Sequence, residues 1–550
     1  MRRLFLSLLL LGFTLSVFAQ AKHPFTFDDM MKLKRVGEPE ISPDGKWVIF
    51  SVVDVDLAAN TKTQHIWIVP VAGGQEKEII ADQDADRPRW APDGKRFAFL
   101  STKEDGSQVW IADFDGATGT VKDRWKQTAI ATEASGELWS PDGRNILFTS
   151  DVYPECDGAP EAEFACNAKK LKEAEQSKVK AQIFDHLLYR HWNAYKEGKR
   201  SHIFVAISEK WPLSAIPPGE VRVVPGNLLS YLPRDLTPGD YDAPVFSLGG
   251  QDNYAFSPDG QEICYASNHD KNPAASTNND LWIVPVSGGQ AKDITADNPA
   301  SDSTPLYSPD GRYIAYRAQQ RPGYESDRFR LMLYDRKTGE KKNLTENFDR
   351  WVGTFAWAAD SSRLYFVSED KGTAPIHSIS FETETNEEKG YDIAIRETNI
   401  KIDAFLPGFN DDLAATADGK LFYTSMSLQG PSEIWALSHV PCSNAPAEDP
   451  SAGSRALKHL LCLVNPITHF NEAVLSQVAM SPIEPFWFTG AHGDKVEGFL
   501  VKPPNFDASK KYPVKFLIHG GPEGAWGDDW SYRWNAELFA APTAATSSGY

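Results

Sequence analysis

Short apolar runs, separated by polar turns, recur along most of the chain. One set directly follows turns of the Pro-Asp-Gly type: Lys46–Val52, Lys95–Ser101, Arg144–Ser150, Gln261–Ser267 and Arg312–Ala318. A second set comes a little later: His65–Val71, Gln108–Phe114, Asp280–Val286 and Arg330–Arg336. These runs are rich in β-branched and aromatic residues and are bounded by turn residues, which is typical of short β-strands. The pattern therefore predicts repeated units of antiparallel strands.

The turns themselves set the repeat. Their aspartates are Asp44, Asp93, Asp142, Asp259, Asp310, Asp360 and Asp418, with steps of 49, 49, 117, 51, 50 and 58 residues. Proline presets φ at the first central position, and glycine adopts the left-handed conformation that closes the hairpin. A period of about 50 residues that recurs seven times predicts a seven-bladed β-propeller over residues 22–474, since each four-stranded blade is buried by its neighbours. Tandem β-sandwich modules are the alternative, although such modules are usually longer.

The one long step marks an insertion at about residues 150–200. Within it, Asn167–Trp192 has few helix breakers and many good helix formers, with Ile183, Leu187 and Leu188 at helical spacing. We expect a helix that projects from one end of the propeller. It either covers a cavity or protects an edge, and the sequence does not decide between the two.

The first 21 residues have the pattern of a secretory signal peptide. Arg2 and Arg3 precede a short apolar run, and Ala19-Gln20-Ala21 forms a small-residue cleavage site. The run is shorter than a membrane span needs, so an uncleaved anchor is the weaker alternative. We expect a secreted protein of the bacterial periplasm, with no membrane attachment after cleavage.

The composition indicates which partners the protein is suited to bind and whether its cysteines form disulfides. With 56 basic and 75 acidic residues the net charge is −19, which makes nucleic acid an unsuitable partner. Five cysteines fit an exported protein: Cys156 with Cys166 and Cys442 with Cys462 are candidate disulfides, and Cys264 is expected to be buried. A metal site at the first pair is an alternative without supporting ligands nearby. No metal and no cofactor are expected, and the acidic stretch at residues 82–86 lacks the pattern of a calcium loop.

After about residue 475 the repeat stops. We expect strands at Phe486–Gly490, Val496–Pro503 and Pro513–Gly521, the last of which ends in His519-Gly520-Gly521-Pro522. An apolar strand followed by this sequence is the oxyanion-loop signature of α/β-hydrolases. Acyl transfer generates an oxyanion, and a glycine backbone lets amide groups approach the substrate carbonyl closely. Residues 475–550 are therefore interpreted as the N-terminal part of an α/β-hydrolase domain.

The combination resembles the prolyl oligopeptidase family of serine peptidases, and most closely its dipeptidyl-peptidase V-like and acylaminoacyl-peptidase-like members. It consists of the leader, the Pro-Asp-Gly blades, the segments Tyr189–Val205 and Leu236–Gly260, and the closing His519–Asn535, which together cover residues 24–540. The resemblance implies a propeller that restricts access to a hydrolase site and a substrate of short peptides. It implies that His519, Gly520 and Gly521 contribute to the oxyanion loop. The aromatic segment Trp526, Trp530, Tyr532, Arg533 and Trp534 would pack behind that loop or within the hydrolase core.

The nucleophile of that family lies in a Gly-x-Ser-x-Gly turn, followed by an acid and a histidine. No such sequence occurs in these 550 residues. We therefore expect a truncated peptidase that is inactive as given and has poor solubility, because an incomplete sheet exposes strand edges. A non-catalytic periplasmic propeller that binds a partner is the alternative. If the enzyme is a dipeptidyl-peptidase, Glu173, Glu175 or Asp185 could bind the substrate's ammonium group. The sequence does not indicate an oligomeric state.

Overall fold

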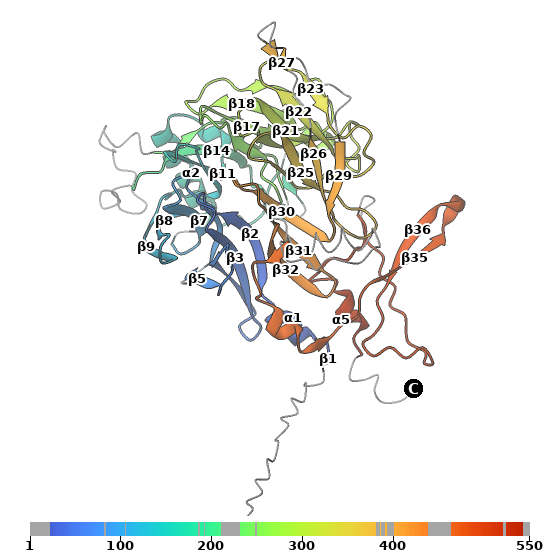
Figure 1. Cartoon of the computed structure of the whole chain (residues 1–550). Coiled ribbons are helices and arrows are strands. Elements are labelled where there is room, and N and C mark those ends of the chain that lie inside the picture. Colours follow the sequence, from blue (N-terminus) through green and yellow to red (C-terminus); the bar gives the residue numbers. More distant parts are fainter. Residues whose placement is uncertain are drawn as a thin grey trace, which may run out of the picture.

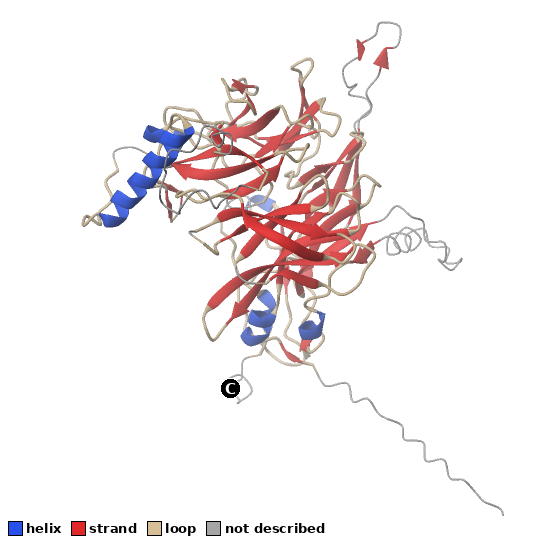
Figure 2. Ribbon diagram, turned by 90° about the vertical axis from the view of Figure 1, so that its left-hand side faces the viewer, coloured by secondary structure: helices blue, strands red, loops and turns tan. Residues whose placement is uncertain are grey.

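Seven four-stranded antiparallel sheets dominate this computed structural model (Figures 1 and 2). It describes residues 22–542 apart from 82–83, 105, 185–186, 192, 211–231, 248–249, 381–384, 387–390, 393–400, 438–463 and 521–523. The seven sheets are the blades of the predicted β-propeller, whose fold class is thus confirmed. The leader and the Cys442–Cys462 pair lie outside the described residues. The domain boundaries at residues 22, 474 and 475 stay predictions.

Each blade is made of four strands in chain order, and in blades 3 and 6 a small separate hairpin lies between two of them. Blade 1 contains β2 (Arg35–Ile41), β3 (Trp47–Asp56), β4 (Thr61–Pro70) and β5 (Lys77–Ile80). Blade 2 contains β6 (Ala85–Trp90), β7 (Arg96–Ser101), β8 (Gln108–Asp115) and β9 (Thr120–Lys126). Blade 3 contains β10 (Ser135–Trp139), β11 (Asn145–Val152), β14 (Arg200–Ile207) and β15 (Arg234–Asp235). Blade 4 contains β16 (Tyr254–Phe256), β17 (Glu262–Ser267), β18 (Asp280–Pro285) and β19 (Lys292–Asp293).

The remaining blades follow the same order. Blade 5 contains β20 (Asp302–Tyr307), β21 (Tyr313–Ala318), β22 (Arg330–Asp335) and β23 (Lys341–Asn343). Blade 6 contains β24 (Phe355–Trp357), β25 (Arg363–Val367), β26 (Ile376–Ser380) and β29 (Lys401–Leu406), with the small hairpin β27 (Thr385–Asn386) and β28 (Tyr391–Asp392) between its last two strands. Blade 7 contains β30 (Phe409–Ala415), β31 (Leu421–Ser427), β32 (Gly430–Leu437) and β33 (Val464–Pro466).

The repeated turn has the chemistry that the sequence predicts. In the first blade the amide of Gly45 donates to the carbonyl of Ser42 at 2.8 Å, and Gly45 has a φ of +69°. The Ser42 hydroxyl donates to Asp44 and accepts from the amide of Trp47. The equivalent backbone hydrogen bond closes the turn in the six other blades, at Gly94, Gly143, Gly260, Gly311, Ser361 and Gly419. The seven turns counted from the sequence are therefore the seven turns between the first and second strands of the blades.

Side chains close the ring between the last and the first blade. Val36 and Phe50 of blade 1 pack in one cluster with Phe422 and Ile434 of blade 7, and Phe50, Phe422 and Ile434 are fully buried. Blade 1 takes all four strands from the N-terminal side and blade 7 takes all four from the C-terminal side. No strand is therefore shared across the junction in the described part of the chain, and burial of apolar surface holds it together.

The helix in the insertion lies earlier than predicted. It is α2 (Pro160–Gln176), preceded by the short helix η1 (Pro154–Cys156), and Figure 2 shows it standing out from the propeller. Proline at the first helical position favours this start. The buried side chain of Asn167 accepts from the amide of Tyr153 at 2.8 Å and fixes the same register. Ile183 is 89% exposed and lies outside the helix, because no described surface is available to its side chain. The predicted span Asn167–Trp192 is thus wrong at both ends.

Residues after the propeller pack on the N-terminal arm. The arm comprises β1 (His23–Pro24) and α1 (Phe27–Lys32), and β1 pairs in parallel with β34 (Val478–Ala479), which follows α4 (Glu472–Leu475). Next come the hairpin β35 (Glu484–Thr489) and β36 (Lys495–Leu500), with η6 (Ala491–Gly493) at its tip, and finally α5 (Ala536–Ala540). In Figure 1 the hairpin projects away from the propeller, and α5 lies near α1.

Two of the three strands predicted after residue 475 are present. The third, Pro513–Gly521, is not a strand in the described residues, since β35 and β36 pair with each other and neither pairs with it. Val514, Phe516 and Ile518 are 87%, 82% and 76% exposed. An apolar segment of this kind needs a neighbouring strand on which to bury its side chains, and none is present in the described chain.

Candidate active site

The C-terminal segment lies against one particular face of the propeller. We call it the docking face: it carries the turn between the second and third strand of each blade. The amide of Asp528 donates to the carbonyl of Gly372, in that turn of blade 6, at 2.7 Å. The Asp528 carboxylate accepts from the amide of Leu428, in the equivalent turn of blade 7, at 2.8 Å. These two contacts fix the segment across blades 6 and 7.

The aromatic residues predicted to support the oxyanion loop have a different main contact. Trp530 is buried edge-to-face against Phe25 of the N-terminal arm, with ring centroids 5.6 Å apart. Tyr532 packs on Trp530, and the guanidinium group of Arg35 lies 4.0 Å from the centre of its ring. Trp534 is half exposed. The sequence does not indicate the arm as a partner, because Phe25 and Trp530 lie at opposite ends of the chain and nothing near either residue points to the other.

The predicted oxyanion-loop residues lie just before this docked segment. His519 and Gly520 are exposed, and His519 Nδ1 lies 3.4 Å from the carbonyl oxygen of Gly520. Gly521 and Pro522 lie outside the described residues. The loop folds back locally, since a Cβ atom on Gly524 would come within 3.5 Å of the Gly520 carbonyl oxygen. The role of His519, Gly520 and Gly521 stays a prediction.

A cavity of about 720 Å³ opens on the same face, at the inner ends of blades 1 to 4. We call it the axial pocket. The first strands of blades 1 and 2 contribute Glu38 and Arg87 to it, and the connections before blades 3 and 4 contribute Glu133 and Asp252. The insertion supplies the outer wall, with Leu171 of α2 and the small hairpin of β12 (Arg190–His191) and β13 (Ala194–Tyr195). The insertion therefore lines a cavity, which was one of its two predicted roles.

A repeated bulge positions residues at this inner edge. Five of the described first strands carry a residue with positive φ at the position six before the turn aspartate: Glu38, Arg87, Gly136, Thr304 and Asp412. The strand register shifts at each of these points, as at Gly37/Glu40 and Asp86/Arg89. A bulge bends the strand and re-aims the side chain. The offset of six residues from each turn is the signal that could have identified these residues from the sequence.

Arg87 is the centre of the pocket's charge network. Its Nη2 donates to both carboxylate oxygens of Asp252, at 2.9 and 2.7 Å, and its Nη1 lies 3.5 Å from Glu38. Arg89 also binds Glu38, at 2.6 Å. Behind them, the side chain of Glu137 is fully buried with its carboxylate 3.6 Å from Arg87 Nε. Burial raises the pKa of Glu137 to about 8 although the two arginines oppose the shift.

One carboxylate of the axial pocket differs from its neighbours. Asp252 and Glu38 are held by arginines, and Asp151 is held by Lys196 at 2.9 Å. Glu133 is exposed in the pocket and forms no ion pair with any described residue. Its backbone has a φ of +63°, a conformation that is unfavourable for a residue with a side chain and is often found at functional sites.

Of the three carboxylates proposed from the sequence, the two that the structure describes do not line this pocket. Glu173 and Glu175 are exposed on α2, and Glu173 pairs with Lys169 on the same helix at 3.8 Å. Asp185 lies outside the described residues. The reason is the corrected register of α2, which turns only Leu171 of this helix toward the cavity.

The cysteine predictions can be checked in part. Cys156 and Cys166 form a disulfide, so this pair is not a metal site, and Cys264 is buried as expected. Among the described residues, no helix combines the length and the apolar character that crossing a membrane requires.

Known proteins resemble this chain over most of its length. No family model matches the chain. It is 28% identical over 516 residues to dipeptidyl-peptidase 5 of Porphyromonas gingivalis, which covers 93% of this chain and 65% of that protein. Dipeptidyl-peptidase 5 of Porphyromonas endodontalis matches with the same identity, over 93% of this chain and 64% of its own. The resemblance to the prolyl oligopeptidase family is confirmed.

A solved structure agrees at the level of the fold. An acylaminoacyl peptidase in complex with Z-Gly-Gly-Phe-chloromethyl ketone matches with a TM-score of 0.64 at 16% identity, over 94% of this chain and 65% of that structure. This likeness shows the fold class, which is a β-propeller followed by the first part of an α/β-hydrolase domain. The chain spans slightly less than two thirds of the length of these prolyl oligopeptidase family relatives, so its activity is treated below as a proposal.

Proposed function

We propose that the protein is a secreted serine-type exopeptidase that hydrolyses short peptides, of the dipeptidyl-peptidase or acylaminoacyl-peptidase kind, and that it works in the bacterial periplasm. One observation carries this proposal. The segment that follows His519 docks on the same propeller face on which the axial pocket opens. A substrate bound in the pocket is therefore held on the side of the propeller where the hydrolase residues lie.

The size and lining of the pocket favour a short peptide. A volume of about 720 Å³ lies within the range of small-molecule sites, roughly 300–1,000 Å³, and is far too small for a folded protein. Its wall carries charges of both signs, among them Arg87 and Lys196 and the carboxylates of Asp151 and Glu133. Peptide termini and backbone groups need charged and polar partners of this kind.

Between the two kinds of exopeptidase, the pocket favours the dipeptidyl-peptidase. A free peptide amino group is a cation and requires a carboxylate that is not already neutralised. Glu133 meets this requirement, because its carboxylate is exposed in the pocket and has no ion pair among the described residues. We assign Glu133 as the group that binds the substrate's ammonium group.

The experiment compares two substrate classes on one protein. The full product of the gene and the 550-residue chain are assayed with chromogenic dipeptides and with acetylated amino-acid substrates. A fluorophosphonate probe labels any active serine, and mass spectrometry identifies the labelled residue. Hydrolysis with labelling supports the peptidase. Absence of both from the full gene product contradicts it and favours the alternative, a propeller that binds a partner.

The Glu133 assignment has its own variant test. Glu133→Gln removes one charge-assisted hydrogen bond, worth about 1.5–3 kcal/mol, which corresponds to a loss of roughly 10- to 100-fold in kcat/KM for free dipeptides. Acetylated substrates should be unaffected. Glu175→Gln, on the exposed side of α2, serves as the matched control. Equal losses on both substrate classes would refute the assignment while leaving the peptidase proposal intact.

A further inference from the structure

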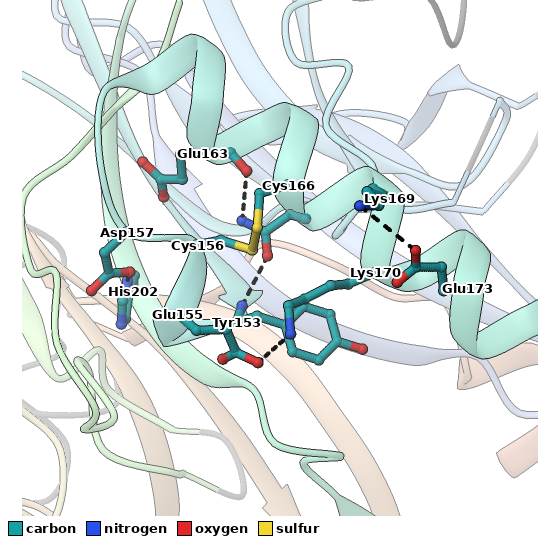
Figure 3. Close-up of a disulfide and its surroundings, with 11 residues drawn as sticks. Tyr153, Glu155, Cys156, Asp157, Glu163, Cys166, Lys169, Lys170, Glu173 and His202 are labelled. Carbon is teal, nitrogen blue, oxygen red and sulfur yellow. Dashed lines mark hydrogen bonds and ion pairs between the residues drawn. A yellow bond between two sulfur atoms is a disulfide. The ribbon is translucent and has the colours of Figure 1, made fainter.

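A second cluster of titratable groups lies at the base of the insertion, apart from the residues that line the axial pocket. It consists of Asp157, Glu163, His202 and Asp235. Asp157 follows η1, Glu163 is in the first turn of α2, His202 is on β14 and Asp235 is on β15. Figure 3 shows Glu163, Asp157 and His202 together on one side of α2, beside the disulfide. No local pattern in the sequence indicates this cluster, because its members are scattered between Asp157 and Asp235.

The geometry around His202 is that of a metal-binding imidazole. The side chain is fully buried, and its Nε2 lies 2.9 Å from the carbonyl oxygen of Gly239, so Nε2 carries a proton and donates it. Its Nδ1 lies 2.7 Å from Asp235 Oδ2 and 4.0 Å from Asp157 Oδ1. A histidine ligand typically donates its second ring N–H to a backbone carbonyl while the other nitrogen binds the ion. Nδ1 faces only oxygen atoms that can accept, so it needs either a proton or a cation.

Two further carboxylate oxygens in this cluster are buried and accept no hydrogen bond from any described residue. Glu163 is 1% exposed, and its Oε1 is buried without a hydrogen bond. The buried Oδ1 of Asp157 is also without one. Buried carboxylates in such positions are usually paired or bound to metal, since an isolated buried charge is very unfavourable. Burial raises the pKa of Glu163 to about 8, with the charge of Asp235 as the next cause.

The surrounding structure holds the two insertion carboxylates in place. Cys156 directly precedes Asp157, and Cys166 lies one turn after Glu163, so the disulfide closes a loop that contains both residues. His202 and Asp235 are neighbours on paired strands of blade 3. An ion bound by all four would join the insertion to the blade and fix the start of α2, the helix that also contributes Leu171 to the axial pocket.

We propose that Asp157, Glu163, His202 and Asp235 form a structural site for a divalent transition-metal cation of the zinc class. One imidazole nitrogen and carboxylate oxygens are suitable ligands for zinc. The candidate ligand atoms of Asp157, His202 and Asp235 lie within 4.8 Å of one another. Glu163 stands outside this group of three, and it would complete the site by turning its buried Oε1 toward the ion. Four-coordinate zinc with bonds of about 2.0 Å needs ligand atoms about 3.3 Å apart. Binding would therefore widen the 2.7 Å separation of Nδ1 and Asp235 Oδ2.

The test measures binding of the metal alone. The purified chain is stripped with a chelator and dialysed against zinc, and bound metal is determined by elemental analysis. Wild type should retain one zinc per chain that the variants lose. His202→Gln and Glu163→Gln should each weaken binding at least tenfold. Glu173→Gln, an exposed glutamate on the same helix, is the matched control and should bind as wild type does.

A second measurement does not depend on how the variants fold. Cobalt replaces zinc in the wild-type chain, and visible absorption reports the coordination. Bands of four-coordinate cobalt, lost on addition of excess zinc, are expected. Three results would each contradict the metal site: no stoichiometric zinc, no cobalt bands, or unchanged zinc binding in folded His202→Gln. His202 Nδ1 would then carry a proton in place of the ion. These readouts are independent of peptidase activity.

Discussion

Replacing Glu137 with glutamine should flatten the dependence of the protein's stability on pH. Glu137 is on β10, the first strand of blade 3, and its side chain is fully buried. Both of its carboxylate oxygens lack a hydrogen bond among the described residues, and Arg87, its nearest cation, commits two donors to Asp252. The pKa of Glu137 is consequently raised to about 8, with burial as the main cause.

The sign and size follow from proton linkage. Between the ordinary pKa of 4.5 and about 8, the folded chain holds a proton on Glu137 that the unfolded chain has released, so stability falls as the pH rises. Below that window both states are protonated and the contribution vanishes. From pH 5 to pH 8 this single group should lower the free energy of unfolding by about 3.5 kcal/mol. Glu137→Gln removes that loss, so the variant should match wild type near pH 5 and exceed it in stability at pH 8.

The assay is urea denaturation followed by tryptophan fluorescence at pH 5, 6, 7 and 8. The difference between the two profiles cancels the titration of all groups that wild type and variant share. Glu175→Gln is the exposed control and should follow the wild-type profile. The reasoning would be refuted if Glu137→Gln ran parallel to wild type over this range, because Glu137 would then be ionised in the fold at little cost.

Three further outcomes test the packing of the C-terminal segment and the insertion. Trp530→Ala removes the ring packed on Phe25 and should weaken this contact by about 3–5 kcal/mol. Limited proteolysis should then cleave residues 526–542 faster, whereas Trp534→Ala, at a half-exposed side chain, should not have this effect. Asp528→Ala removes the acceptor for the amide of Leu428 and should cost about 1–3 kcal/mol, seen as faster hydrogen exchange at that amide but not at Gly45. The double change Cys156→Ser and Cys166→Ser opens a loop closed across a sequence separation of 10 and should lower stability in urea by about 3 kcal/mol, while Cys264→Ser alone tests whether any loss of cysteine has the same effect.

The blades could be predicted because their information is local. Each Pro-Asp-Gly turn encodes its own hydrogen bond and its own positive φ, as at Gly45, so seven turns in the sequence are seven turns in the fold. The sequence predicts the helix of the insertion in the wrong place because the apolar spacing of Ile183 and Leu187 suggests a buried face. Both side chains are exposed, and the true register depends on Pro160 and on the buried contact of Asn167 with Tyr153.

The residues of the axial pocket are brought together by contacts across the ring of blades, and no local sequence pattern indicates such contacts. Arg87 and Asp252 are 165 residues apart, and nothing near either residue indicates the other. The oxyanion-loop motif at His519 can be proposed from adjacent residues alone, and its role stays a prediction. The sequence does not distinguish Glu133 from other exposed glutamates, because only the cavity around it sets this residue apart.

The way the ring closes explains why the N-terminal arm packs against the segment on the docking face. Blade 7 and blade 1 meet through side chains such as Phe422 and Phe50, so the chain needs no N-terminal strand to complete its last sheet. Residues before blade 1 are therefore free to pack elsewhere. They do so on the segment that follows the propeller, through Phe25 on Trp530 and through the pairing of β1 with β34. Asn471 ties the exit of blade 7 to the arm, because its side-chain amide donates to the carbonyl of Lys34 and its Oδ1 accepts from the amide of the same residue. The two ends of the propeller thus meet at one point, and from that point the docked segment crosses the face on which the axial pocket opens.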